Sequence, residues 1–176
     1  MGNRGGRLHD DQQGLGARRW TSKAWIACVC DFRGRWRPVF GKGYTELFFR
    51  DEPTALAAGH RPCFQCRYAD AQAFRAAFPG VGPSAGQMDV TLHEERLDPA
   101  RLTRPLALDD LPEGAMVVWR EAAHLWAGRR LRRWGFGDYG PAEIPPRGAD
   151  APALTPPSIL AALRAGYRPR SDGVPT

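Results

Sequence analysis

Two cysteines separated by two residues are the first feature of this sequence that points to chemistry. Cys63 and Cys66 form a C-x₂-C unit directly after Pro62. This spacing lets a tight turn bring both sulfurs within about 2.3 Å of one tetrahedral ion, with backbone N–H groups free to bond the thiolates. Two free thiols on a turn and a redox pair are the alternative interpretations. We favour a metal site, and a sulfur-rich four-coordinate shell favours zinc over iron in a redox-inert role.

A tetrahedral site needs two more ligands. Cys28 and Cys30 are the first choice because alternate residues of a strand project to the same face. Two cysteines in an apolar strand are also often plain core. His60, just ahead of Cys63, is the alternate ligand of a Cys₃His set. We therefore expect a Zn²⁺ site built from Cys28, Cys30, Cys63 and Cys66, with His60 as the substitute.

A carboxylate and a histidine lie one helical turn apart further along the chain. Asp89 and His93 share one face of a helix predicted over 88–97, and Glu94 follows them. A carboxylate beside an imidazole fixes its tautomer and raises its basicity, which is the arrangement of a general base. An ordinary ion pair on a solvated helix face explains the same spacing. These residues support the alternative that the chain is a metal-containing hydrolase or nuclease.

Arginine dominates the charge of the chain. Its 25 Lys and Arg residues outnumber its 19 Asp and Glu residues, which gives a formal net charge of +6. A basic surface attracts polyanions, so DNA or RNA is the expected partner. For the arginines of 129–133, a soluble hairpin whose charged edges discourage aggregation is the alternative interpretation. The residues predicted to contact nucleic acid are Arg33, Arg35, Arg37, Arg129, Arg130, Arg132 and Arg133.

Alternation of hydrophobic and breaker residues predicts an α+β fold. We expect strands in the metal-binding half, then a short helix between Asp51 and Gly59, the C-x₂-C turn and further helices. The second half is expected to hold a small antiparallel β-meander and a last helix capped by Ser158. The predicted strands are 24–30, 36–40, 44–49, 116–119, 123–126 and 131–134. The predicted helices are 54–58, 69–78, 88–97 and 158–165.

Composition divides the chain into four regions. They are a polar basic arm over 1–19, a metal-binding knuckle over 20–80, a helix and β-meander region over 81–170, and a flexible tail over 171–176. We expect the second and third regions to pack as one globular unit. Neither a signal peptide nor a membrane span is visible, so we expect a soluble, cytoplasmic protein.

The stretch around the C-x₂-C unit resembles a known zinc domain. Residues 44–70 carry aromatic residues at the end of a strand, a short helix ending Ala-Ala-Gly, then Arg-Pro-Cys, two residues and Cys. This order resembles the N-terminal zinc-binding domain of the Ada methyl-phosphotriester DNA-repair family. The resemblance implies a Cys₄ zinc site in which Cys63 and Cys66 are the second pair. The family's first pair is C-x₃-C in a loop, whereas Cys28 and Cys30 are one residue apart, so the family's methyl-accepting role is not carried over to them.

These observations together predict a small zinc-binding protein that works as a nucleic-acid-associated module. The enzyme built on His93, Asp89 and Glu94 is one alternative. A protein-interaction module with a purely structural zinc is the other, and it predicts no salt-sensitive binding to DNA or RNA.

Overall fold

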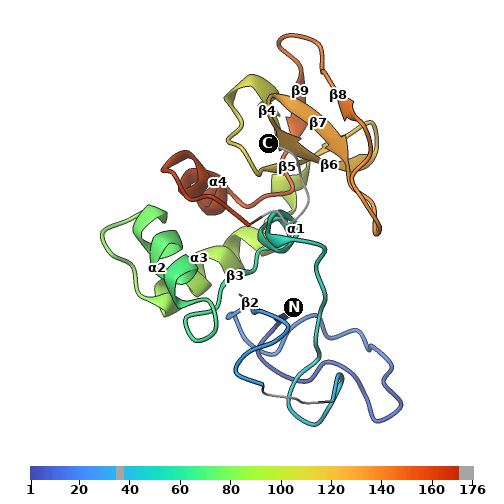
Figure 1. The fold of residues 1–176 in the computed structure, drawn as a ribbon, viewed down its shortest axis with the longest axis vertical. Helices are drawn as coiled ribbons and strands as arrows, with labels where there is room; N and C mark the ends of the chain where they lie inside the picture. Colours follow the sequence, from blue (N-terminus) through green and yellow to red (C-terminus); the bar gives the residue numbers. More distant parts are fainter. Residues whose placement is uncertain (35–37, 171–176) are drawn as a thin grey trace.

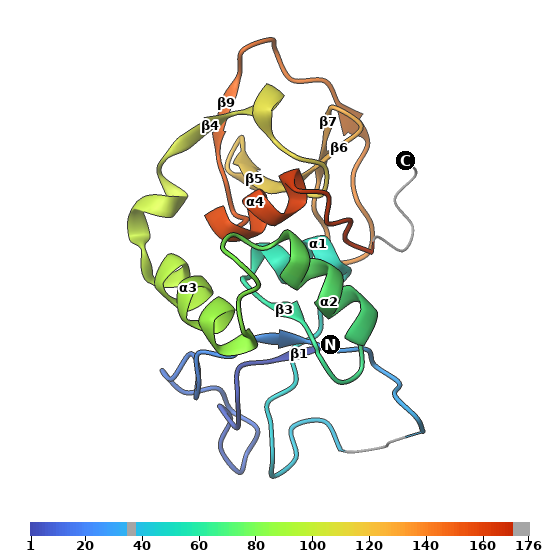
Figure 2. The same ribbon diagram turned by 90° about the vertical axis from the view of Figure 1, so that its left-hand side faces the viewer.

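The computed structural model of the chain describes residues 1–34 and 38–170. It has three tiers along its longest axis (Figures 1 and 2): a coil-rich N-terminal lobe (residues 1–50), a layer of helices, and β-sheet at the opposite end. The predicted α+β class is confirmed.

No helix within the described ranges is both long enough and apolar enough to cross a membrane.

A small sheet of three distant segments joins the N-terminal lobe to the helices. β1 (Gly2–Asn3) lies antiparallel to β2 (Ile26–Ala27), and β2 pairs in parallel with β3 (Arg61–Pro62). Of the strand predicted over 24–30 only Ile26–Ala27 forms, and it finds long-range partners on both of its edges. Residues 38–40 form part of a turn and a bend-rich loop, and positions 36 and 37 lie outside the described residues.

The first 19 residues, expected as an arm, pack against the rest of the N-terminal lobe. Gly2 bridges Leu47, and that bridge is all that forms of the strand predicted over 44–49. The Thr45 hydroxyl accepts from the Leu8 N–H at 2.7 Å and lies 2.6 Å from Nδ1 of the buried His9. A Cβ at Gly2 would lie 2.6 Å from the Phe49 ring, so the chain can approach this closely only at a glycine.

The first helix has the cap and the stop that the sequence predicts, although it starts and ends slightly before the predicted range of 54–58. α1 (Glu52–Ala57) is capped by Asp51, whose carboxylate accepts from the Thr54 N–H at 2.9 Å. Gly59, at φ 76°, ends the helix in the left-handed region. The buried Glu52 carboxylate accepts hydrogen bonds from Arg67, the Tyr167 hydroxyl and the Arg170 N–H, at 2.6, 2.5 and 2.8 Å. These bonds tie the described end of the chain to the start of α1.

Three longer helices complete the middle layer: α2 (Tyr68–Ala77), α3 (Ala85–Leu97) and α4 (Pro157–Arg164). α3 begins three residues before the predicted start because Ser84 and Gln87 form a capping box. Ser158 does not cap α4 as predicted, since Pro156 occupies the N-cap. The Ser158 hydroxyl instead donates to the Glu95 carboxylate at 2.5 Å and joins α4 to α3.

The predicted β-meander is present. β5 (Met116–Trp119), β6 (Ala122–Ala127), β7 (Arg130–Arg133) and β8 (Ala142–Glu143) pair antiparallel in sequence order. A second sheet joins β4 (Pro105–Ala107) to β9 (Asp150–Pro152), next to the 3₁₀ turns η1 (Pro99–Leu102) and η2 (Leu108–Asp110). The largest core lies between the helices and the meander. Its fully buried large side chains include Leu56, Phe74, Met88, Leu92, Val117, Leu131, Ile159 and Leu163.

Candidate metal centre

Parallel strand pairing brings the cysteines of two distant segments together. The register sets Ala27 opposite Pro62, so Cys28 and Cys63 leave the ends of β2 and β3 side by side. The Cys63 N–H donates to the Ala27 carbonyl at 3.0 Å and continues the ladder by one step. The two cysteines are held by backbone hydrogen bonds and need no side-chain contact to meet.

The C-x₂-C turn adds the third sulfur. The Arg67 N–H donates to the Cys63 carbonyl at 3.0 Å, which closes a turn immediately before α2. The Gln65 N–H donates to the Cys63 sulfur at 3.3 Å. The sulfurs of Cys28, Cys63 and Cys66 all lie within 4.8 Å of one another, and all three residues are half-buried. A tetrahedral ion with bonds of about 2.3 Å holds sulfurs about 3.8 Å apart, so this sulfur triad is positioned to hold a metal ion.

Hydrogen bonding within the triad separates the acidities of its thiols. The Cys28 thiol and the backbone N–H groups of Cys66 and Gln65 lower the pKa of Cys63 to about 5, against the opposing effect of burial. The same contact with Cys63, together with burial, raises the pKa of Cys28, and burial raises that of Cys66. An ion bound by three thiolates must displace the protons that the metal-free thiols still hold.

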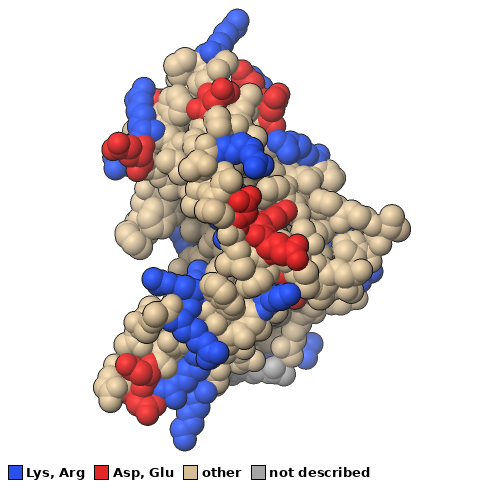
Figure 3. All heavy atoms as spheres, turned by 180° about the vertical axis from the view of Figure 1, so that it is seen from behind, with Lys and Arg blue, Asp and Glu red and all other residues tan. Residues whose placement is uncertain are grey.

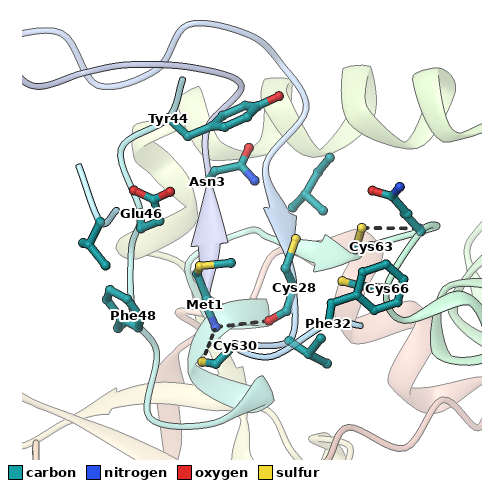
Figure 4. A pocket seen from close by; sticks show the side chains of 14 residues that line it. Met1, Asn3, Cys28, Cys30, Phe32, Tyr44, Glu46, Phe48, Cys63 and Cys66 are labelled. Carbon is teal, nitrogen blue, oxygen red and sulfur yellow. Dashed lines mark hydrogen bonds between the residues drawn. The ribbon is translucent and has the colours of Figure 1, made fainter. Parts of the chain in front are cut away.

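Cys30 lies apart from the other three cysteines. β2 ends at Ala27, so the alternation that would turn Cys28 and Cys30 to one face does not continue. Cys30 is exposed, and its sulfur lies 3.9 Å from the amino nitrogen of Met1, which also donates to the Cys28 carbonyl at 3.1 Å. Figure 4 shows the Cys30 sulfur turned toward Met1, away from Cys63 and Cys66. Among the described residues, the ligand atoms that lie close enough to share one ion are the sulfurs of Cys28, Cys63 and Cys66, and Cys30 is not one of them.

His60 lies outside the triad, in an aromatic enclosure. Its ring is fully buried, with centroids 5.2 Å from Trp25 and 4.7 Å from Phe49. Burial lowers the pKa of His60 well below its usual value, and the positive charges of Arg4 and Arg96 lower it further. The histidine is therefore held neutral as part of the packing beneath β3. It is not one of the side chains that lie together as possible metal ligands.

The candidate catalytic residues on α3 do not contact one another as predicted, because Asp89 and His93 each have a different partner. Both Asp89 carboxylate oxygens accept hydrogen bonds from the Arg61 guanidinium at 2.8 Å, in a pair that is almost fully buried. The His93 ring packs edge-on against Trp20 at 5.3 Å, and Glu94 is exposed. Asp89 therefore orients Arg61 rather than His93. Arg61 was missed by sequence reasoning, because nothing in a spacing of 28 residues links it to Asp89.

The predicted nucleic-acid arginines occupy opposite ends of the molecule. Arg33 is exposed, with its guanidinium carbon 5.1 Å from the Phe32 ring centroid in the N-terminal lobe. Arg129 lies at the β6–β7 turn in the other end tier and pairs with Asp109 at 2.7 Å (Figures 1 and 2). The other residues of this prediction are Arg130 and Arg133, which are exposed, Arg132, which is half-buried, and Arg35 and Arg37, which lie outside the described residues. The described members do not form one surface.

A cavity of about 690 Å³ adjoins the sulfur triad (Figure 4). Its lining includes all four cysteines together with Ile26, Phe48 and Tyr44. The walls are largely apolar and aromatic, with Asn3, Glu46 and Gln65 as polar members, and they include the three sulfurs of the triad. An ion on the triad would lie where a molecule entering the cavity could reach it.

Comparisons with protein-family models, with curated proteins and with solved structures gave no match. The metal-binding interpretation therefore depends on the sulfur geometry and on the strands and turn that hold it.

Proposed function

We propose that this chain is a zinc-binding protein in which Cys28, Cys63 and Cys66 hold one Zn²⁺ ion. The observation that carries the proposal is the approach of three sulfurs from two segments within 4.8 Å. Thiolates select zinc among abundant redox-inert ions. Because Cys28 belongs to the N-terminal lobe and the other two ligands lie in the turn just before α2, the ion fastens this lobe to the helical layer.

The N-terminal lobe has a physical need for such a fastening. Its described regular structure consists of β1 and β2, each two residues long. A segment with so little regular structure gains stability from a metal clip, as small metal-stabilised domains do. Three protein ligands leave the fourth tetrahedral position to water or to a group entering from the cavity.

The second part of the proposal is association with nucleic acid, and the distribution of charge supports it. Residues 1–50 contain ten Lys and Arg against four Asp and Glu, whereas residues 51–176 contain fifteen of each. The whole net charge of +6 therefore belongs to the N-terminal lobe. A strongly basic lobe on a neutral body concentrates polyanion attraction on one end of the molecule. An Ada-like arrangement of residues 44–70 remains part of this proposal, with the metal in a fold-stabilising role.

Elemental analysis with thiol titration tests the zinc site. We expect one zinc per chain, three cysteines protected until a chelator is added, and one cysteine that reacts throughout. Cys30→Ser should remove the reactive thiol and keep the zinc, whereas Cys28→Ser should lose it. Four protected thiols would instead bring Cys30 into the shell, and a metal-free protein with four reactive thiols would refute the site.

Salt-dependent binding tests the nucleic-acid part separately. The logarithm of the binding constant for the zinc-loaded protein should fall linearly with the logarithm of salt concentration, because phosphate contacts release counterions. Zinc-loaded protein without any binding to DNA or RNA would leave the metal site standing and favour a protein-interaction module.

A further inference from the structure

One arginine of the N-terminal lobe and one of α3 both pack against the same tryptophan. The guanidinium carbon of Arg4 lies 3.9 Å from the Trp25 ring centroid, and that of Arg96 lies 4.2 Å from it. Trp25 is 7% exposed and contacts Trp20, whose ring centroid is 6.4 Å away. His93 packs on Trp20 in turn. We call these five residues the Trp25 cluster.

The arginines of this cluster are held by hydrogen bonds to neutral carbonyls and not by ion pairs in the described part of the chain. Arg4 donates to the Arg19 carbonyl at 3.2 Å, and Arg96 donates to the carbonyls of Gly59 and Lys23 at 2.7 and 2.8 Å. In the described part of the chain, neither Arg4 nor Arg96 forms an ion pair with a carboxylate, and Arg19 and Lys23 form none either. Neutral carbonyls fix the geometry while the charge remains available to an anion.

Among the described residues, the carboxylates whose charge acts on the cluster come from α3. The carboxylates of Asp89 and Glu95 attract Arg96, and Glu94 attracts His93. Asp89 is already bound by Arg61, and Glu95 accepts from Ser158. The lobe side of the cluster, which carries Arg19 and Lys23, is basic.

Polar atoms without partners gather at the same place. Six of the eleven buried side-chain nitrogen and oxygen atoms that lack a partner in the described residues belong to the cluster or to the adjoining His60. His60 and Trp25 are each more than nine-tenths buried. The six atoms are Nε of Arg4, Nε of Arg96, Nε1 of Trp25, Nδ1 of His93, and Nδ1 and Nε2 of His60. Buried polar atoms without partners cost stability, so their concentration marks this part of the molecule as unusual.

Figure 3 shows Lys and Arg side chains in a band along the N-terminal lobe, seen from behind. Arg18, Arg19 and Lys23 are exposed. Arg19 and Lys23 adjoin the cluster, since their carbonyls accept from Arg4 and Arg96, and they give it a basic rim at the end of the molecule that holds all of the net charge.

We propose that the Trp25 cluster and its rim residues Arg19 and Lys23 bind single-stranded nucleic acid, which deepens and rests on the nucleic-acid part of the proposed function. Phosphates lie against Arg19, Lys23 and the edges of the stacked guanidiniums, and an unstacked base lies on the partly exposed Trp20 ring. Aromatic faces interleaved with basic groups suit single strands, whose bases are free to stack.

Matched charge reversals test where the strand binds. Arg19→Glu with Lys23→Glu and Arg130→Glu with Arg133→Glu each replace two exposed cations by anions, and each lowers the net charge from +6 to +2. Fluorescence anisotropy with labelled oligo(dT), oligo(rU) and duplex DNA of about 20 nucleotides, a length that exceeds one single-strand site, reports binding to zinc-loaded protein.

We expect the first double variant to weaken single-strand binding at least tenfold and to reduce the salt slope by about 1.4, for two lost contacts at about 0.7 each. The β7 double variant should change binding less than threefold. Equal losses in both variants would show that net charge alone decides, and would overturn the location while leaving nucleic-acid association intact. Tighter binding to duplex than to either single strand would overturn the choice of ligand.

Substitutions of Trp20 test the stacking step. Trp20→Phe keeps an aromatic face and should weaken single-strand binding less than threefold, whereas Trp20→Leu should weaken it at least fivefold. Equal affinity of the two variants would exclude a base on Trp20. Circular dichroism and zinc content separate this result from a loss of fold, because both variants should match the wild type in both measurements. Wild-type protein that holds zinc and binds no oligonucleotide would refute the nucleic-acid part of the proposed function itself.

Discussion

Removal of the metal should loosen the N-terminal lobe before the rest of the molecule. An ion that joins Cys28 to Cys63 closes a loop of 35 residues across the β2–β3 junction. The entropy that a cross-link of this span removes from the unfolded chain corresponds to about 4 kcal/mol at 25 °C. For a chain of this size, each kcal/mol shifts Tm by about 2–4 °C. Chelation should therefore lower Tm by about 8–16 °C.

Differential scanning calorimetry with and without chelator measures this shift, and added zinc should restore the original Tm. Hydrogen exchange locates it: after chelation, amides of residues 1–50 should lose protection while those of β5, β6 and β7 keep it. We expect this difference because the lobe would lose its metal clip, whereas the meander packs against the core that it shares with the helices.

The cysteine variants supply the controls for this experiment. Cys28→Ser should have the lower Tm at the outset and should not respond to chelator. Cys30→Ser should behave as the wild type in both conditions. A chelator effect below about 2 °C, or a Cys28→Ser protein that still responds to chelator, would refute the idea that the ion fastens the lobe.

Three further predictions concern the packing around the centre. His60 stays neutral in the fold but takes up a proton below about pH 6.5 when the chain is unfolded. The free energy of unfolding should therefore fall below about pH 6.5, by up to about 1.4 kcal/mol for each pH unit. Urea unfolding at pH 7.5 and 5.5 measures this fall, and His60→Phe should lack the part that comes from His60. Asp89→Ala leaves the buried Arg61 without its carboxylate partner and should lower the stability by about 3–5 kcal/mol. Glu94→Ala, at an exposed position of the same helix, should change it by less than about 0.5 kcal/mol. Equal effects of the two substitutions would contradict the pairing of Arg61 with Asp89. Gly2→Ala should cost about 1–3 kcal/mol by overpacking, and Gly16→Ala, with open space around it, should be neutral in the same thermal unfolding assay.

Local signals in the sequence predict the parts of the fold that local physics decides. The Asp51 cap and the Gly59 stop mark α1 because capping and left-handed backbone depend on a few adjacent residues. The meander follows from alternation and from turns between neighbouring strands. The early start of α3 was also readable, since Ser84 and Gln87 have the spacing of a capping box.

Long-range pairing limits what can be predicted about the site. The pattern of 24–30 correctly indicates an extended, apolar segment, but its partners lie at the N-terminus and beyond α1. The assumption that Cys28 and Cys30 share a face follows from a strand that in fact stops at Ala27. The meeting of Cys28 with the C-x₂-C unit, and of Arg61 with Asp89, depends on tertiary packing that spacing along one sequence does not reveal.

The hydrogen bonds at Glu52 have a consequence for the order in which the chain matures during synthesis. Two of the three donors to this buried carboxylate belong to residues 167 and 170, more than a hundred positions later. A ribosome extends the chain from the N-terminus, so the carboxylate at the start of α1 lacks these donors while most of the protein is being made. The buried carboxylate at the start of α1 therefore gains its full set of hydrogen bonds only after the last helix has emerged, although the cap and the stop of α1 are local and can form earlier.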